Sequence, residues 1–171
     1  MRKSRAAAVS AGFFVVAPGT VVGLVPWLIT RWRVRRPLPG AARVVGAVLV
    51  AAGLVPATSA FAEFVKAGGT PIPVAPTERL VVSGFNRHVR NPMYLGLLLS
   101  IIGQAVLFGN VRLLAYAAAA WAVPAAFVRW YEEPTLARTF GAEYEEYRRS
   151  VPAWLPRTTP WTPPAREDTG R

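Results

Sequence analysis

Residues 91–133 read NPMYLGLLLSIIGQAVLFGNVRLLAYAAAAWAVPAAFVRWYEE, and most of the expected architecture follows from them. Two runs without Asp, Glu, Lys or Arg, Met93–Val111 and Leu113–Val128, are separated only by Arg112. A helix needs about 20 apolar residues to cross the hydrocarbon core of a bilayer; the first run approaches that length and the second is shorter. Because only residues 109–112 lie between the helical cores, we expect a tight helical hairpin in a membrane.

The rest of the chain has the same apolar character. Of its 171 residues, 53% are hydrophobic and 17% are charged, whereas about a quarter are charged in an ordinary soluble domain. Two further charge-free runs, Ala6–Thr30 and Val44–Ala62, are candidate spans. We therefore predict an all-α fold, a polytopic transmembrane helical bundle of about four spans in which the last two form the hairpin.

The first run leaves two arrangements open. Pro18-Gly19 lies in its middle and breaks or kinks a helix, so the run is either one kinked span or a re-entrant hairpin. A single crossing with a cytoplasmic N-terminus places the arginines of residues 31–36 outside, against the positive-inside tendency. A re-entrant segment removes that conflict.

Composition excludes several classes of site. The chain has no cysteine, which rules out disulfides and thiolate ligands, and its single histidine, His88, argues against a multi-histidine metal centre. We expect no metal. A net charge of +11 would suggest nucleic acid in a soluble protein, but here the arginines flank apolar runs. We expect them to meet anionic lipid headgroups, with a lipid bilayer and no nucleic acid as partner.

The chain divides into three parts. Residues 1–62 are expected to be N-terminal membrane segments, residues 63–156 the core, and the proline-rich residues 157–171 an extended or disordered tail. Within the core, Glu132–Arg149 has the pattern of one amphipathic helix that lies along the membrane surface or caps the bundle. Its apolar face consists of Leu136, Phe140, Tyr144 and Tyr147.

A first polar cluster precedes the hairpin. Asn91 is a good helix N-cap, and Pro92 suits the first helical position. The free N–H groups of this first turn, with Arg90 and the Tyr94 hydroxyl, form a potential anion site. An ordinary capped helix with interfacial Arg and Tyr anchors explains the same residues without a ligand.

A second polar cluster, Arg129-Trp-Tyr-Glu-Glu133, follows the hairpin. Arg129 stands three residues before Glu132 and four before Glu133, so an α-helix would place all three on one face. An interfacial salt bridge is the alternative explanation. A hairpin brings both clusters to the same end, where a zwitterionic amino acid group would fit between them.

These residues also carry a family resemblance. The segment VRNPMYLG at 89–96, followed by Glu132-Glu133, Leu136, FG at 140–141, Tyr144, Tyr147 and VP at 151–152, resembles the isoprenylcysteine carboxyl methyltransferase family. That family and its phospholipid N-methyltransferase relatives are integral-membrane enzymes that use S-adenosylmethionine. The resemblance covers residues 68–156.

The resemblance implies a role for each matching residue. The implied catalytic residues are Arg129, which would orient an accepting carboxylate, and Glu132. Glu133, with help from Glu132, would hold the amino group of the cofactor. The other implied cofactor-binding residues are Arg90, Asn91, Tyr94, Leu95 and Gly96. Members that methylate prenylated proteins have histidine where this chain has Asn91, and asparagine cannot transfer a proton by titration.

Our hypothesis is an S-adenosylmethionine-dependent membrane methyltransferase that methylates a carboxylate of a lipophilic, isoprenoid-like substrate entering from the bilayer. We expect a multi-pass protein of the cell inner membrane with its cofactor site facing the cytoplasm. Arg129 favours an anionic acceptor because it would repel a protonated amine. Two alternatives stay open: a phospholipid or other lipid N-methyltransferase, and a non-catalytic membrane scaffold with the same fold.

Overall fold

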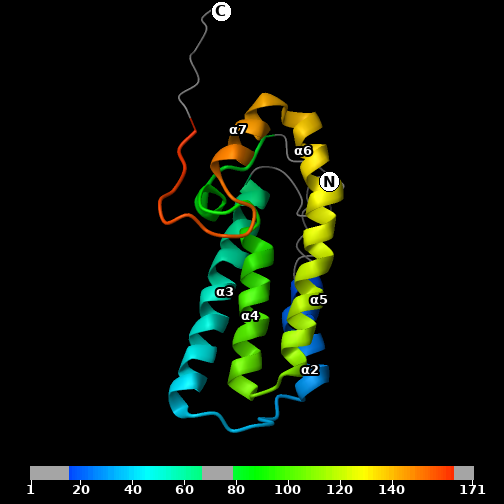
Figure 1. The fold of residues 1–171 in the computed structure, drawn as a ribbon, viewed down its shortest axis with the longest axis vertical. Coiled ribbons are helices and arrows are strands. Elements are labelled where there is room, and N and C mark those ends of the chain that lie inside the picture. Colours follow the sequence, from blue (N-terminus) through cyan, green and yellow to red (C-terminus); the bar gives the residue numbers. More distant parts are fainter. Residues whose placement is uncertain (1–15, 67–78, 164–171) are drawn as a thin grey trace, which may run out of the picture.

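The computed structural model describes residues 16–66 and 79–163, and every regular element within them is helical (Figure 1). The long helices run along one axis, with α3 and α5 on either side of α4 and the N-terminal helix packed against α4 and α5. Shorter elements cover one end, which we call the cap end. In chain order the elements are η1 (Gly19–Leu24), α2 (Val25–Thr30), α3 (Gly40–Lys66), η2 (Gly84–Arg87), α4 (Pro92–Phe108), α5 (Arg112–Phe127), η3 (Val128–Glu132), α6 (Glu133–Phe140) and α7 (Ala142–Ser150).

Two described helices are long and apolar enough to cross a membrane. One is Gly40–Ala60 within α3, and the other is Arg112–Phe140, in which α5, the π-helical η3 and α6 continue one another. Val16–Thr30 and Pro92–Phe108 are apolar but shorter. The all-helical prediction is confirmed for the described residues, and two of the four expected spans meet this criterion of length and composition.

The hairpin between α4 and α5 is confirmed. Helix α4 ends at Phe108, and Gly109 follows in the left-handed region at φ +57°, where a residue without a Cβ is favoured. The side-chain oxygen of the buried Asn110 accepts a hydrogen bond from the backbone N–H of Arg112, 3.1 Å away. This contact starts α5 and closes the turn.

Glycines set the close approach of α3 and α4. A Cβ at Gly53 would overlap the backbone oxygen of Gly96, and one at Gly103 would lie 2.7 Å from the oxygen of Gly46. Small residues of this kind let helix backbones pack closely where apolar burial alone is a weak driving force. Gly96 therefore packs toward α3.

The N-terminal helix is continuous from Val16 to Thr30, so a re-entrant turn at Pro18-Gly19 is not found. The π-helical bonding of η1 absorbs the break: the N–H of Val25 bonds the carbonyl of Thr20. The first residues of the expected segment, 6–15, lie outside the described residues.

The cap end contains two short helices where one amphipathic helix was predicted. Gly141, at φ +53°, ends α6 and turns the chain into α7. The predicted apolar face is correct, because Tyr144 and Tyr147 form a buried cluster with Val151. The residues packed against this cluster are Leu80, Val82, Leu136, Ala137, Phe140 and Trp161. The face therefore covers the loop before α4 and caps the bundle.

Residues 152–163, which we call the strap, run along the loop before α4. Backbone N–H groups of Arg90, Arg157 and Trp161 bond the carbonyls of Pro152, His88 and Arg87, each at 2.9 Å. Residues 152–163 form no regular element, and these bonds fix the strap on the loop. The expectation of an extended or disordered tail stays a prediction. Residues 164–171 lie outside the described part.

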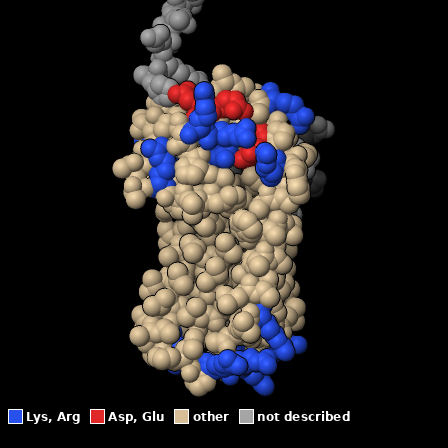
Figure 2. Space-filling model, viewed as in Figure 1, with Lys and Arg blue, Asp and Glu red and all other residues tan. Residues whose placement is uncertain are grey.

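On the face seen in Figure 2, the charged side chains of the described residues gather at the two ends of the molecule. Figure 2 shows Lys and Arg at both ends and a wide band between them that carries no charged side chain on this face. The end opposite the cap holds the arginine cluster of residues 31–36, and the cap end carries both signs of charge.

Candidate active site

The candidate site lies at the cap end, where α4 begins and η3 meets α6. Asn91 is the N-cap residue of α4 and Pro92 takes the first helical position, as predicted. The Asn91 side chain, however, makes no capping bond: its amide donates to the carbonyl of Ala153 in the strap at 3.1 Å. Asn91 is only 7% exposed. A buried side-chain amide needs a hydrogen-bond partner, and here the strap provides it instead of the first turn of α4.

The two predicted clusters meet through an ion pair. The guanidinium of Arg90 lies 2.7 Å from the Glu133 carboxylate, and both side chains are nearly buried, at 12% and 11% exposure. Arg148 from α7 approaches the other carboxylate oxygen of Glu133 at 3.8 Å. The expectation that the hairpin brings the clusters together is confirmed for this pair.

Two buried polar atoms at the site have no hydrogen-bond partner among the described residues. They are Nε of Arg90, a donor, and Oε2 of Glu132, an acceptor. Tyr94, one turn into α4, lies within electrostatic range of the Glu132 carboxyl group. Buried polar groups are nearly always paired, so an unpaired donor and acceptor at one site call for an explanation.

Arg129 does not contact the buried cluster of Arg90 and Glu133. Its side chain is exposed, and it makes no ion pair or hydrogen bond within the described part of the chain. The segment Val128–Glu132 is π-helical, with i→i+5 bonding, so the spacing argument for an α-helix does not apply. The three side chains differ in exposure, because Arg129 is exposed, Glu132 is half-buried and Glu133 is buried, so Arg129 is not part of the buried cluster.

Leu95 and Gly96 do not offer free backbone to the cluster either. The N–H of Leu95 bonds the carbonyl of Asn91 within the helix at 3.1 Å. Gly96 is buried against Gly53 and Ala57 of α3.

Sequence reasoning missed the part that α7 plays. The Tyr144 hydroxyl accepts a bond from Arg90 at 3.1 Å, and the Tyr147 hydroxyl donates to the carbonyl of Asn86 at 2.7 Å. Burial, and after it the charge of Glu133, raises the pKa of Tyr144 to about 12; burial also raises the pKa of Tyr147. The available signal was their position on an apolar helix face, because a buried tyrosine hydroxyl needs a partner.

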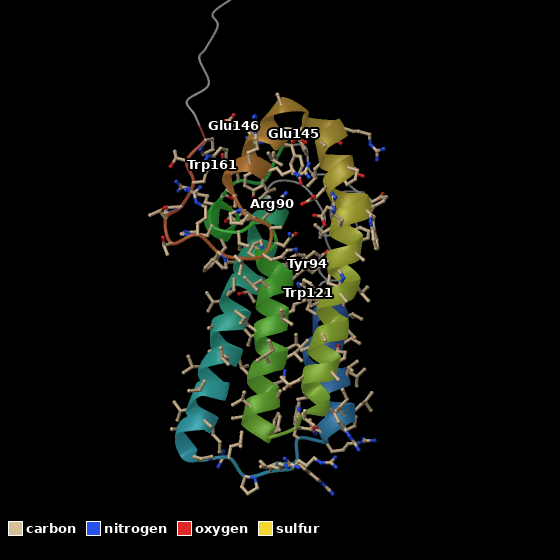
Figure 3. All side chains as sticks on the ribbon, in the orientation of Figure 1. Arg90, Tyr94, Trp121, Glu145, Glu146 and Trp161 are labelled. Atoms are coloured by element: carbon tan, nitrogen blue, oxygen red, sulfur yellow. The ribbon has the colours of Figure 1, made fainter. Side chains whose placement is uncertain are left out.

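Below the polar cluster lies an apolar cavity of about 550 Å³ between α4, α5 and η1. Helix α4 contributes Tyr94, Leu97 and Ile101 among others, and the small residues Ala119 and Ala120 of α5 leave the space open. Figure 3 shows Arg90 and Tyr94 at successive levels from the cap end downward. The volume falls in the usual range of small-molecule pockets, and the cavity begins where the polar cluster ends.

The chain is similar to one family model and to individual methyltransferases. Residues 41–143 match the family model described as phospholipid methyltransferase. The chain is 32% identical over 114 residues to protein-S-isoprenylcysteine O-methyltransferase A of Arabidopsis thaliana, which covers 66% of this chain and 55% of the relative. It is 35% identical over 78 residues to protein-S-isoprenylcysteine O-methyltransferase of Schizosaccharomyces pombe, covering 45% of this chain and 33% of the relative. The chain thus spans about half the length of the Arabidopsis relative and a third of the yeast one.

Proposed function

The chain belongs to the phospholipid methyltransferase family, and we propose that it is an S-adenosylmethionine-dependent membrane methyltransferase with a lipophilic acceptor. The observation that carries this proposal is the pair of unpartnered buried atoms, Nε of Arg90 and Oε2 of Glu132. A free amino acid group offers a carboxylate and an ammonium, which are the complements of that donor and that acceptor.

The residues at the site fit the amino acid end of the cofactor. Arg90 would hold its carboxylate through the free Nε, while its Nη1 stays on Glu133. Glu132 would accept from the amino group, since the Glu133 carboxylate is already engaged by two arginines. When bound, S-adenosylmethionine supplies a methyl group on a positively charged sulfur.

The chain's own contribution is positioning and exclusion of water. Methyl transfer is an in-line displacement, so aligning the acceptor with the methyl carbon supplies much of the rate. The strap and α7 cover the polar cluster, with Ala153 bonded to Asn91 and Tyr144 bonded to Arg90. A dry site favours reaction because the acceptor loses its shell of water.

We propose that the acceptor is a carboxylate on an isoprenoid-like chain, with that chain in the apolar cavity. Support comes from the two relatives, which are protein-S-isoprenylcysteine O-methyltransferases. The Arg129 side chain is exposed and does not contribute to this proposal. A phospholipid amine is the second candidate acceptor, favoured by the match to the phospholipid methyltransferase family.

We further propose that all four apolar segments lie in the bilayer, with the cap end at the cytoplasmic face of the inner membrane. The uncharged band supports the first part. Both ends of the molecule carry arginines, so the orientation is supported by the charged cofactor, which must arrive from the aqueous cytoplasm, and not by the positive-inside tendency.

Cofactor binding to purified protein in detergent tests this function. Glu132→Gln removes the charge of the free acceptor, and Arg90→Lys keeps a charge but removes the free Nε. A charge-assisted hydrogen bond is worth about 1.5–3 kcal/mol, so we expect titration calorimetry to give dissociation constants at least about tenfold weaker for each. The exposed Glu146→Gln and Arg138→Lys are matched controls and should bind as wild type.

If the wild-type protein does not bind the cofactor at millimolar concentration, the proposal is contradicted. The alternative of a non-catalytic membrane scaffold would then remain. The acceptor is tested separately by transfer of labelled methyl groups into lipid extracts. Base-labile label indicates methyl esters, as we expect, whereas stable N-methyl products would establish the second candidate.

A further inference from the structure

The apolar cavity has a defined depth along the helix axes. On α4 it runs from Met93 near the polar cluster to Ile101, and on α5 from Phe127 to Tyr116. At 1.5 Å of rise per residue, these spans correspond to about 12 Å and about 16 Å. One leaflet of a bilayer is about 15 Å deep, half of the hydrocarbon core. The cavity is therefore comparable in length to a lipid chain within one leaflet.

A polar crosslink lies at the deep end of the cavity. The Tyr116 hydroxyl donates to the carbonyl of Val21 at 2.9 Å, and Tyr116 and Val21 both line the cavity. Just below Ile101, the side-chain amide of Gln104 donates to the carbonyl of Val22 at 2.8 Å. The first bond joins α5 to η1 and the second joins α4 to η1. The three helices that line the cavity are therefore linked at one level.

Helix geometry explains why this crosslink holds. The N–H of Val25 bonds Thr20 instead of Val21, and Pro26 has no N–H to offer. The carbonyl of Val21 therefore has no helical donor, and Tyr116 supplies one. Movement of the Tyr116 ring would leave this carbonyl without a partner in an apolar setting, so the bond holds the ring among the lining residues at the level of Val21.

We propose that Tyr116 sets the length of the apolar chain that the cavity accepts, an inference that rests on the proposed function. The ring blocks the deep end by its size, and its hydroxyl fixes the ring in place. Each methylene that enters the cavity adds about 0.8 kcal/mol, or about fourfold in affinity. Affinity should rise with chain length until the chain reaches Tyr116 and should then stop rising.

The experiment measures binding of saturated alkyl carboxylates of increasing length to purified wild type, Tyr116→Ala and Tyr116→Phe, by calorimetry in detergent without cofactor. In wild type we expect affinity to increase about fourfold per methylene up to a plateau. In Tyr116→Ala the plateau should move to longer chains, and in Tyr116→Phe, which keeps the ring, it should stay. Trp121→Ala is the matched control, because Trp121 is an aromatic residue of α5 that packs on Trp154 and does not line the cavity.

Cofactor binding reports whether each variant is folded, and Tyr116→Leu replaces Tyr116→Ala if the latter fails this check. A plateau at the same length in wild type and in the folded small variant, or a steady rise without a plateau in wild type, would overturn the role of Tyr116. Such results with normal cofactor binding leave the proposed function standing. Loss of cofactor binding in wild type would instead contradict the proposed function.

Discussion

Arg90 and Glu133 form a nearly buried ion pair, 2.7 Å apart, between the loop that precedes α4 and the first residue of α6. The pair joins the two ends of the helical hairpin at the cap. Arg90 also donates to Tyr144, and its backbone N–H bonds Pro152 in the strap. A single arginine thus connects the hairpin, α7 and the strap, and its Nε is still free for a ligand.

Removing the charge of Glu133 should destabilise the protein strongly. Glu133→Gln leaves the Arg90 guanidinium buried without its counter-charge, and breaking such a pair costs about 3–5 kcal/mol. Glu145, which pairs with Arg148 at 3.5 Å between more exposed side chains, is the control. Glu145→Gln should change the free energy of unfolding by less than about 1 kcal/mol. Denaturant titration in detergent checks both, and equal stabilities of the two variants would contradict the assignment.

Close packing of α3 on α4 should make Gly53 intolerant of a side chain. Gly53→Ala places a Cβ against the backbone oxygen of Gly96 and the side chain of Ser100, and overpacking of this kind costs about 1–3 kcal/mol. Gly23→Ala is the matched control, since nothing lies within 4 Å of its Cβ. We expect a lower thermal midpoint for Gly53→Ala only. A midpoint at or above that of wild type would show that the helices separate at no cost.

The strap should loosen when Arg87 is removed. Arg87 donates through Nε to the carbonyl of Trp161 at 2.7 Å and through Nη2 to Thr162 at 2.8 Å. In Arg87→Ala we expect faster cleavage of residues 152–163 in limited proteolysis, followed by mass spectrometry, with little change in the global unfolding midpoint. Arg149→Ala, which removes a bond within α7, should be cleaved like wild type. Unchanged strap cleavage in Arg87→Ala would mean that these bonds do not hold it.

The stability of the cap should depend on pH above 10. The pKa of Tyr144 is raised from 10.0 to about 12 in the folded protein. Because the folded pKa lies above the unfolded one, this stabilising contribution is complete below pH 10 and is lost as the pH rises toward 12. Unfolding measured across this range should show a smaller decline for Tyr144→Phe than for wild type. Tyr131→Phe, at an exposed position, should follow wild type, and identical slopes for all three would contradict the prediction.

Local sequence signals were sufficient for the long helices, the hairpin and the apolar face at the cap, but not for the break between α6 and α7. Charge-free runs marked the long helices, Gly109 and Asn110 marked the turn between α4 and α5, and the spacing of Tyr144 and Tyr147 marked an apolar face. These predictions succeed because they depend on hydrophobic transfer and backbone sterics, which act over a few residues.

The contacts around the site were predicted less well. Arg129 and Glu132 lie three residues apart in the π-helical η3, yet Arg129 is exposed and Glu132 is half-buried. The proline-rich composition of the strap predicts an extended or disordered chain without a regular element. Its order depends on acceptors in the loop before α4, which only the folded chain brings within reach.

The amino-acid sequence alone thus established the helices, the hairpin and the identity of the polar residues at its ends, because each follows from short-range patterns. Only the tertiary structure decided which arginine pairs with Glu133, which atoms stay without partners and where the cavity ends. Those outcomes depend on side chains competing for partners across different helices, and that competition has no trace in local residue order.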